Sequence, residues 1–454
     1  MNCKYLCNAF EHICSMYICH MTYEQCLDYL YSKLPMFSRI GSAALKNNLD
    51  NTLKLLEFLE NPHTKFKSIH IAGTNGKGSV SHMLASIFQS AGYKTGLYTS
   101  PHLKDFRERI RINGEMIKEK DVLDMTLRLT PIIEDIEPSF FEATVAMAFY
   151  FFSKNEVDIA IIETGLGGRL DSTNVIIPEL SIITNIGFDH MNVLGNTLIE
   201  IASEKAGIIK NEVPVIVGRK DEATKNIFVN KALETNSTLT FSADVYDSDI
   251  VDLSPDLISL QLRNKINGEE YDVKSDLPGI YQKENIATVA AAVDLLNQKG
   301  WNLTRNAMLD GLKATKKNTA LFGRWDMLQK KPMLVLDVAH NEDGFSILLN
   351  HLSHFKIDQI HFILGFSKDK DFGKILDMLP LNAIFYFTSA NSPRALEHKN
   401  LQEIAATKGL IGESFINVHD AISNALKNAR ENDIIIVTGS IYVVGDVNRD
   451  RYCC

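Results

Sequence analysis

Residues 68–79 read SIHIAGTNGKGS and join an apolar run to a loop with three glycines in the six residues 73–78. The apolar run predicts a buried strand, and a helix is expected to open at Ser79. Glycines let backbone N–H groups approach a phosphate closely, and a helix N-terminus favours negative charge. Lys77 can neutralise phosphate oxygens, and the Ser79 hydroxyl can reach Mg²⁺. The segment therefore predicts a nucleotide-phosphate site.

The spacing of this loop differs from the common P-loop, in which Ser or Thr directly follows the lysine. Here Gly78 stands between Lys77 and Ser79. Two interpretations remain open at this point: a tight strand-to-helix turn without a ligand, or a phosphate loop of a less common kind. A lysine flanked by glycines in such a turn favours the phosphate loop.

Short runs rich in Ile and Val alternate with amphipathic stretches on both sides of the loop. Strands are expected at 68–72, 96–99, 157–162, 181–185 and 214–217, and helices at 79–91, 121–129, 141–154, 198–208, 283–299 and 305–313. Residues 237–278 lose the helical pattern and predict a small antiparallel excursion. A second series follows Trp325, with strands expected at 333–338, 360–364, 383–388 and 434–437. This alternation predicts an α/β fold with a mainly parallel sheet.

A chain of 454 residues is expected to form two or more domains. Residues 1–21 form an extension that we expect to be disordered. The body divides into an ATP-binding domain over 22–320 and a smaller C-terminal domain over 325–454, and 316–323 is the candidate linker because it begins polar and ends in Gly323.

The composition excludes several classes of protein. A formal net charge of -9 and a pI of about 5.8 argue against a broad nucleic-acid surface, where a basic face is expected. No apolar run approaches the roughly 18 residues that span a bilayer, so no membrane partner is expected.

The seven cysteines all lie near the ends of the chain, and none falls between residues 27 and 452. This placement excludes a catalytic cysteine or a cysteine-based zinc cluster in the body of the protein. The N-terminal group lacks a repeated CxxC pair and is interpreted as part of a frayed extension. Unpaired cysteines indicate a reducing cytoplasm.

Three further polar residues stand out in the body. Glu163 ends an apolar run, and glycine-rich residues 165–168 follow it. A carboxylate at the carboxyl end of a parallel strand lies where open α/β sheets bind ligands. His190 follows the next expected strand and is either a metal ligand or a turn residue. On its own, Lys205 is interpreted as a solvated helix lysine.

Taken together, these segments resemble the folylpolyglutamate synthase and dihydrofolate synthase family within the Mur ligase superfamily. The resemblance runs in order from about residue 22 to 444. Its motifs are HIAGTNGKGS at 70–79, YTSPHL at 98–103, ERIRING at 108–114, ETGLGGRLDSTN at 163–174, NIGFDH at 185–190, SEKAGI at 203–208, FGR at 322–324 and LDVAHN at 336–341.

The resemblance implies a P-loop ATPase domain, a smaller Rossmann-like domain and an active site in the cleft between them. It implies metal binding by Ser100, Glu163 and His190, with two Mg²⁺ sites, and catalytic roles for Lys77, Glu163, His190 and Lys205. The position matching Lys205 is carbamylated in many members. The implied ATP-contacting residues are Asn75, Gly76, Lys77, Gly78, Ser79, Asn285, Arg324 and Asp337. The implied substrate-contacting residues are Ser139, Phe140, Phe141, Glu142, Leu170, Asp171 and Ser172.

The implied activity is ATP-dependent addition of L-glutamate to dihydropteroate, to reduced folates, or to both, by a monomer. Carboxylates are poor acyl donors, so phosphoryl transfer would first make an acyl phosphate that the amine attacks. Closure of the two domains would keep water from this intermediate. One alternative is a muramyl-peptide ligase, although about 70 residues before the loop are few for a further domain. A second is an ATP-binding regulator without catalysis.

Overall fold

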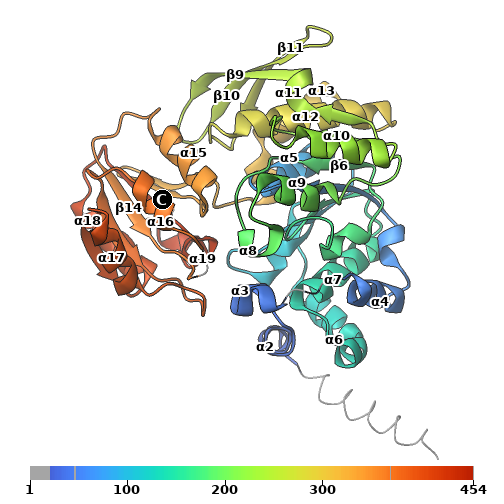
Figure 1. Cartoon of the computed structure of the whole chain (residues 1–454), viewed down its shortest axis with the longest axis horizontal. Coiled ribbons are helices and arrows are strands. Elements are labelled where there is room, and N and C mark those ends of the chain that lie inside the picture. The colour runs from blue at the N-terminus through green and yellow to red at the C-terminus, as the bar shows by residue number, and fades with distance from the viewer. Residues whose placement is uncertain (1–20, 45, 47, 369, 453–454) are drawn as a thin grey trace, which may run out of the picture.

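The structure is a computed structural model of the chain, and it describes residues 21–44, 46, 48–368 and 370–452. The expectation for residues 1–20, and for all the cysteines except Cys26, lies outside these residues. Two α/β units are seen side by side, the larger formed by the N-terminal two thirds of the chain (Figure 1). The predicted fold class, with a large mainly parallel sheet and a second smaller α/β unit, is confirmed.

The larger unit contains an eight-stranded sheet with the order β4-β3-β2-β5-β1-β6-β7-β8. Strand β1 is central, because it pairs in parallel with β5 on one side and β6 on the other. The strands are β1 (Lys67–Ala72), β2 (Thr95–Tyr98), β3 (Ile110–Ile112), β4 (Glu115–Met116), β5 (Ile159–Glu163), β6 (Leu180–Ile183), β7 (Val215–Val217) and β8 (Leu239–Phe241). The only antiparallel pairs in this sheet are made by β3, with β2 and with the edge strand β4.

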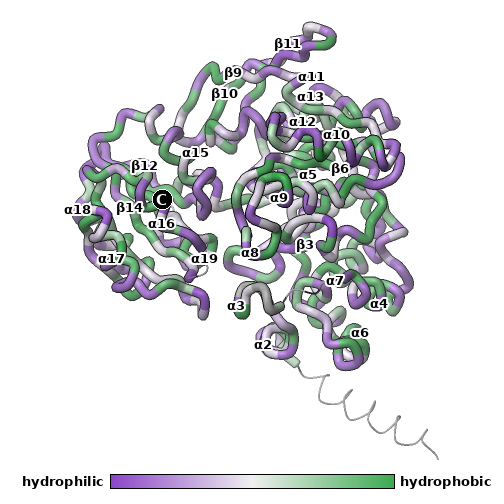
Figure 2. Tube along the Cα trace, viewed as in Figure 1, coloured by the Kyte–Doolittle hydropathy of each residue, from purple (hydrophilic) through white to green (hydrophobic). Residues whose placement is uncertain are grey.

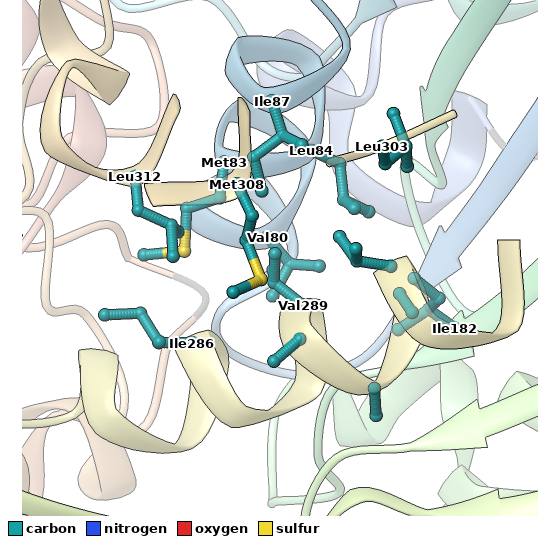
Figure 3. Packing of buried hydrophobic residues seen from close by; sticks show 14 of the residues in the cluster. Val80, Met83, Leu84, Ile87, Ile182, Ile286, Val289, Leu303, Met308 and Leu312 are labelled. Atoms are coloured by element: carbon teal, nitrogen blue, oxygen red, sulfur yellow. The ribbon is translucent and has the colours of Figure 1, made fainter. Parts of the chain in front are cut away.

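Helices cover both faces of this sheet. One face packs against α5 (Lys77–Ser90), α12 (Gln282–Gln298) and α13 (Arg305–Lys313), whose side chains interlock in Figure 3. The other face packs against α7 (Phe140–Lys154). The remaining helices of this unit are α2 (Tyr23–Lys33), α3 (Phe37–Ile40), α4 (Asp50–Phe58), α6 (Glu119–Ile136), α8 (Met191–Leu194), α9 (Leu198–Ala206), α10 (Lys225–Glu234) and α11 (Ser242–Val245).

The predicted antiparallel excursion is confirmed as a three-stranded sheet with the order β11-β10-β9. Its strands are β9 (Tyr246–Leu253), β10 (Ile258–Asn264) and β11 (Glu270–Ser275). The start of the predicted range was wrong, because β8 pairs in parallel with β7 and belongs to the main sheet. The inner face of the small sheet joins the core around α12.

The smaller unit is a six-stranded sheet with the order β12-β13-β17-β14-β15-β16, in which only β12 runs antiparallel. Its strands are β12 (Asp326–Lys330), β13 (Met333–Leu336), β14 (Ile360–Leu364), β15 (Ile384–Thr388), β16 (Gly412–Phe415) and β17 (Ile434–Thr438). Its helices are α15 (Glu342–Leu352), α16 (Gly373–Met378), α17 (His398–Thr407), α18 (Val418–Asn428) and α19 (Ile441–Gly445). Apolar cores lie on both faces of the sheet.

The structure corrects three local predictions. Helix α5 begins at Lys77 rather than Ser79. The first half of the candidate linker is helix α14 (Thr315–Thr319), which packs on α5. Cys26 is a fully buried free thiol that hydrogen-bonds Thr126, so it belongs to the core and not to a frayed extension.

Hydrophobic and hydrophilic stretches alternate along both units rather than forming one long apolar segment (Figure 2). Within the described part of the chain, no helix has the length and apolar character needed to cross a bilayer.

Candidate active site between the two units

The loop after β1 turns sharply before α5 and packs tightly against β6. Gly73 has φ +150°, and a Cβ on it would lie 1.9 Å from Oγ1 of Thr184. Gly76 has φ +85°, and its Cβ would lie 2.6 Å from Oδ1 of Asn285. Only glycine fits these two positions, so the sequence spacing follows from the close approach of the neighbouring chain.

Two lysines converge on the same carbonyl oxygen of the loop. Lys77 Nζ donates to Gly73 O at 3.0 Å, and Lys205 Nζ donates to the same oxygen at 2.9 Å. Lys205 is 3% exposed, so its interpretation as a solvated lysine was wrong. Burial and the positive charge of Lys77 lower the pKa of Lys205 to about 7. At neutral pH, a large fraction of the molecules therefore carries Lys205 as a neutral amine.

The carboxylate of Glu163 ends β5 beside the loop. Its Oε2 accepts a hydrogen bond from the Ser100 N–H at 3.3 Å. Burial raises the pKa of Glu163 to about 6, although Lys77 and Arg324 oppose the rise. A Cβ on Gly78 would lie 3.9 Å from this carboxylate and 3.8 Å from Nη2 of Arg324. The extra glycine of the loop therefore faces both the acid and an arginine of the smaller unit.

Asp189 joins the two units at the mouth of this cleft. Its carboxylate is 10% exposed and accepts hydrogen bonds from His340 Nε2 at 3.2 Å, from Asn341 Nδ2 at 3.4 Å and from Lys370 Nζ. Burial alone would raise the pKa of Asp189, but the His340 hydrogen bond and the surrounding positive groups hold it well below its usual range. Asp189 is therefore an ionised anchor for the smaller unit.

A second contact joins the loop itself to the smaller unit. The side-chain amides of Asn75 and Asn341 bond each other, at 3.1 Å and 3.4 Å. Asn341 also caps α15 by accepting from the Gly344 N–H at 2.8 Å. Hydrogen bonds through Asn341 thus connect the glycine loop to the start of α15 across the cleft.

The first cavity, of about 250 Å³, lies between the two units over the glycine loop. It is lined by all the predicted catalytic, metal-binding and ATP-contacting residues: Asn75, Gly76, Lys77, Gly78, Ser79, Ser100, Glu163, His190, Lys205, Asn285, Arg324 and Asp337. Gln282 on α12 fixes two of them, because its amide donates to Ser79 Oγ at 3.3 Å and accepts from Asn285 at 2.8 Å.

Asp337 supports the smaller unit's side of this cavity. Its two oxygens accept from the Trp325 N–H and the Ala339 N–H, both at 2.9 Å. Burial raises the pKa of Asp337, and these bonds together with the Arg324 charge oppose the rise. Trp325 is completely buried, stacked on Phe355 and edge-on to His351.

A second cavity, of about 450 Å³, adjoins the first. Ser100 and His190 line both cavities, so the two spaces meet beside Glu163. All of the predicted substrate-contacting residues line the second cavity: Ser139, Phe140, Phe141, Glu142, Leu170, Asp171 and Ser172.

Local structure explains how several of these residues are held. Ser139 and Glu142 form a capping box at the start of α7, with Glu142 Oε2 accepting from the Ser139 N–H at 2.6 Å. Among the described residues, the buried Glu142 Oε1 has no hydrogen-bond partner. A Cβ on Gly165 would lie 2.4 Å from the ring of Phe141, so this glycine lets the ring lie against the backbone.

The three proposed metal ligands fit a divalent cation that arrives with a nucleotide. Among residues that the structure describes, no group of three or more His, Cys, Asp and Glu side chains forms a metal site. The buried carboxylate of Glu163 has one long hydrogen bond and lies beside Ser100. Burial lowers the pKa of His190 to about 3, so its imidazole is neutral and can bind a metal. Magnesium usually takes only one or two protein carboxylates and completes its shell with phosphates and water.

Sequence reasoning missed residues that the structure brings to the site. Asp189, His340 and Asn341 lie inside the NIGFDH and LDVAHN motifs, but none of the three was selected as a site residue. Lys370 had no comparable signal, because it lies in a polar turn far away in the sequence.

Comparison with known families defines the class of protein. The Mur ligase middle domain matches residues 71–293, and the Mur ligase glutamate ligase domain matches residues 323–441. These two segments correspond to the two units that enclose the first cavity. The chain belongs to the folylpolyglutamate synthase and dihydrofolate synthase family of Mur ligases, which are ATP-dependent ligases.

Individual relatives match along most of their length. The dihydrofolate synthase/folylpolyglutamate synthase of Bacillus subtilis is 32% identical over 419 residues, covering 89% of this chain and 95% of that protein. The folylpolyglutamate synthase of Lacticaseibacillus casei is 30% identical, with 94% and 98% covered. The crystal structure of the Thermotoga maritima folylpolyglutamate synthase has a TM-score of 0.78 at 33% identity, with 93% and 95% covered. Escherichia coli FolC in complex with DHPP and ADP has a TM-score of 0.82 at 28% identity, with 94% and 96% covered.

Proposed function

We propose that the chain uses ATP to join L-glutamate to the carboxyl group of dihydropteroate, of a reduced folate, or of both. One observation carries the proposal: the first cavity, at the glycine loop, meets the second cavity at Ser100 and His190. A nucleotide in the first cavity and a carboxylic acid in the second would bring the γ-phosphate and the carboxylate together. Solved relatives described as complexes with ADP, or with AMPPCP and folate, support this pairing.

Phosphoryl transfer would then activate the carboxylate. An oxygen of the acceptor carboxylate attacks the γ-phosphorus, the bond to the β-phosphate oxygen breaks, and ADP and an acyl phosphate form. Lys77 and Arg324 would spread the negative charge that moves during this step. When bound, Mg²⁺ would supply further charge neutralisation, and we assign Ser100, Glu163 and His190 to hold it.

Amide formation would follow in the same closed space. The amine of L-glutamate attacks the acyl carbon, phosphate leaves, and no protein nucleophile takes part. Contacts from Asp189 and Asn75 to the smaller unit would keep the site closed and exclude water, which would otherwise hydrolyse the acyl phosphate.

Lys205 is proposed to act as a carbamate. Its neutral amine can attack CO₂, forming a carbamate and releasing one proton, which places a negative charge at the end of this buried side chain. The low pKa of about 7 and the burial of Lys205 support this modification.

A product assay tests the proposal. The protein is incubated with ATP and glutamate, and dihydropteroate and tetrahydrofolate are compared as acceptors. We expect a glutamylated product with at least one of them, with ADP and phosphate formed in equal amounts. ATP hydrolysis or ATP binding with no glutamylated pterin product would contradict the proposal. Action as a cytoplasmic monomer stays a prediction. The molar mass in solution, measured by light scattering, tests whether the protein is a monomer.

A further inference from the structure

A buried hydrogen-bonded chain of three side chains ends at the second cavity. Asp171 Oδ1 lies 2.5 Å from Oγ1 of Thr173, and this hydroxyl lies 2.8 Å from Nε2 of His70. All three residues are buried, with exposures of 5%, 0% and 0%. His70 lies in the middle of β1, three residues before the glycine loop begins.

The direction of these bonds follows from the chemistry of the groups. An ionised carboxylate only accepts, so the single proton of the Thr173 hydroxyl goes to Asp171. The hydroxyl oxygen then accepts the N–H of His70 Nε2. Burial, with a contribution from Lys210, lowers the pKa of His70 to about 3, so the ring is neutral. Donation to Thr173 Oγ1 then requires the single ring proton to lie on Nε2.

A histidine at this position of a central strand lowers the stability of the fold. Among the described residues, Nδ1 of His70 has no hydrogen-bond partner. The residues on either side of His70 in the strand, Ile69 and Ile71, are apolar and fully buried. A buried ring nitrogen without a partner destabilises the fold, and an apolar residue would avoid that penalty. The Asp171 turn itself needs no histidine, because the Thr173 N–H already donates to Asp171 Oδ1 at 3.0 Å. The geometry therefore points to a role for His70 at the other end of this series of hydrogen bonds, at Asp171.

We infer that Thr173 and His70 act in series as positioning residues, which orient the Asp171 carboxylate toward the acceptor in the second cavity. The Leu166 N–H holds the other oxygen at 2.8 Å, so the carboxylate is fixed from two sides. The carboxylate also faces the second cavity, from which an N–H donor of the acceptor ring could approach it. This inference rests on the proposed function, because it takes a pterin ring as the donor.

The KM values of Thr173 variants test whether Thr173 and His70 position the Asp171 carboxylate. Thr173→Val keeps the shape and removes the hydroxyl, and we expect the KM for the acceptor to rise about five- to tenfold, as for one lost hydrogen bond of ordinary strength. The KM for ATP should stay within about twofold, and Thr173→Ser should restore the acceptor KM. Thr52→Val is the matched control, because Thr52 is fully buried and its hydroxyl has no partner among the described residues.

His70 supplies the second half of the test. His70→Leu should raise the acceptor KM as Thr173→Val does, and the double variant should be no worse than either single one, because the groups act in series. His70→Gln retains an N–H donor and should recover part of the loss. Additive effects, an equal rise in the KM for ATP, or no rise in the acceptor KM would overturn the inference.

A separate measurement does not depend on turnover. Nitrogen NMR of histidine-labelled protein should show His70 with its proton on Nε2, and a proton on Nδ1 would overturn the inference. If the unmodified protein glutamylates no pterin acceptor, the proposed function fails, and the hydrogen-bonded chain is then judged by this tautomer alone.

Discussion

Lys77 is the residue whose removal should affect the chemistry most directly. Its amine bonds Gly73 O and Thr74 O, close to where the γ-phosphate is proposed to lie. We expect Lys77→Ala to lower kcat at least about a hundredfold, as for the loss of a main electrostatic contact in the transition state. Circular dichroism and thermal unfolding should be nearly unchanged, since the side chain is only half-buried. Substantial residual turnover would refute the phosphate role of Lys77.

Lys205 should respond to both pH and CO₂. Carbamylation needs the neutral amine, whose fraction rises with pH through the folded pKa of about 7. We therefore expect little carbamate at about pH 6 and increasing amounts above neutrality. Carbon NMR after addition of labelled bicarbonate measures the carbamate, and Lys205→Arg, which cannot be carbamylated, serves as the control. An equal signal in both proteins would argue against the assignment.

At the residue scale, motif position was a better guide than the character of each side chain alone. Lys205 looks like a surface residue within its own helix, and only the fold shows that it turns toward Gly73 O. Asp189 lies beside a selected histidine, yet its partners His340 and Lys370 come from loops of the smaller unit. A contact between sequence positions so far apart depends on packing that no local pattern encodes.

At the element scale, the turn between β1 and α5 should tolerate no side chain at its first glycine. Gly73→Ala places a methyl group 1.9 Å from Thr184 Oγ1, which bonds Asn75 O at 2.5 Å. We expect the loop to shift and the affinity for AMPPCP to fall at least about tenfold, measured by calorimetry.

Gly92 offers a matched control for this turn. It has φ +89° and nothing within 4 Å of an added Cβ, so an alanine there would have a strained backbone but would meet no neighbouring atom. Gly92→Ala should cost about 1 kcal/mol of stability and leave the affinity for AMPPCP unchanged. Equal losses of affinity in the two variants would attribute the effect to general destabilisation.

Strands and long helices were predicted well because their periodicity is local. Strand β14 and helix α13 match the expected ranges to the residue. Short α14 was missed because Lys316, Lys317 and Asn318 give it a polar, loop-like composition. Its stability comes from tertiary contacts instead: Thr319 Oγ1 lies 2.8 Å from His82 Nδ1, and Asn318 donates to Ser86 Oγ at 3.0 Å.

For the whole molecule, Asp189 should control how far the two units separate. Asp189→Asn removes a buried charge that binds His340 and Lys370, which would weaken the closed form by about 1–3 kcal/mol. We expect a larger radius of gyration in small-angle X-ray scattering of the nucleotide-free variant. Lys330→Ala is the control, because the Lys330–Asp256 pair also joins the units but is exposed and should contribute little. A radius unchanged by Asp189→Asn would show that other contacts maintain closure.

The buried position of Trp325 gives the molecule an optical reporter of its own. The chain has two tryptophans, and Trp301 lies away from the cleft, in an edge-on cluster with Phe88 and Tyr93. Trp325 follows Arg324 directly and bonds Asp337, so a nucleotide that moves either residue would change its emission. A Trp301→Phe variant would emit from one indole only. Stopped-flow fluorescence could then follow occupancy of the site in real time, without any attached dye.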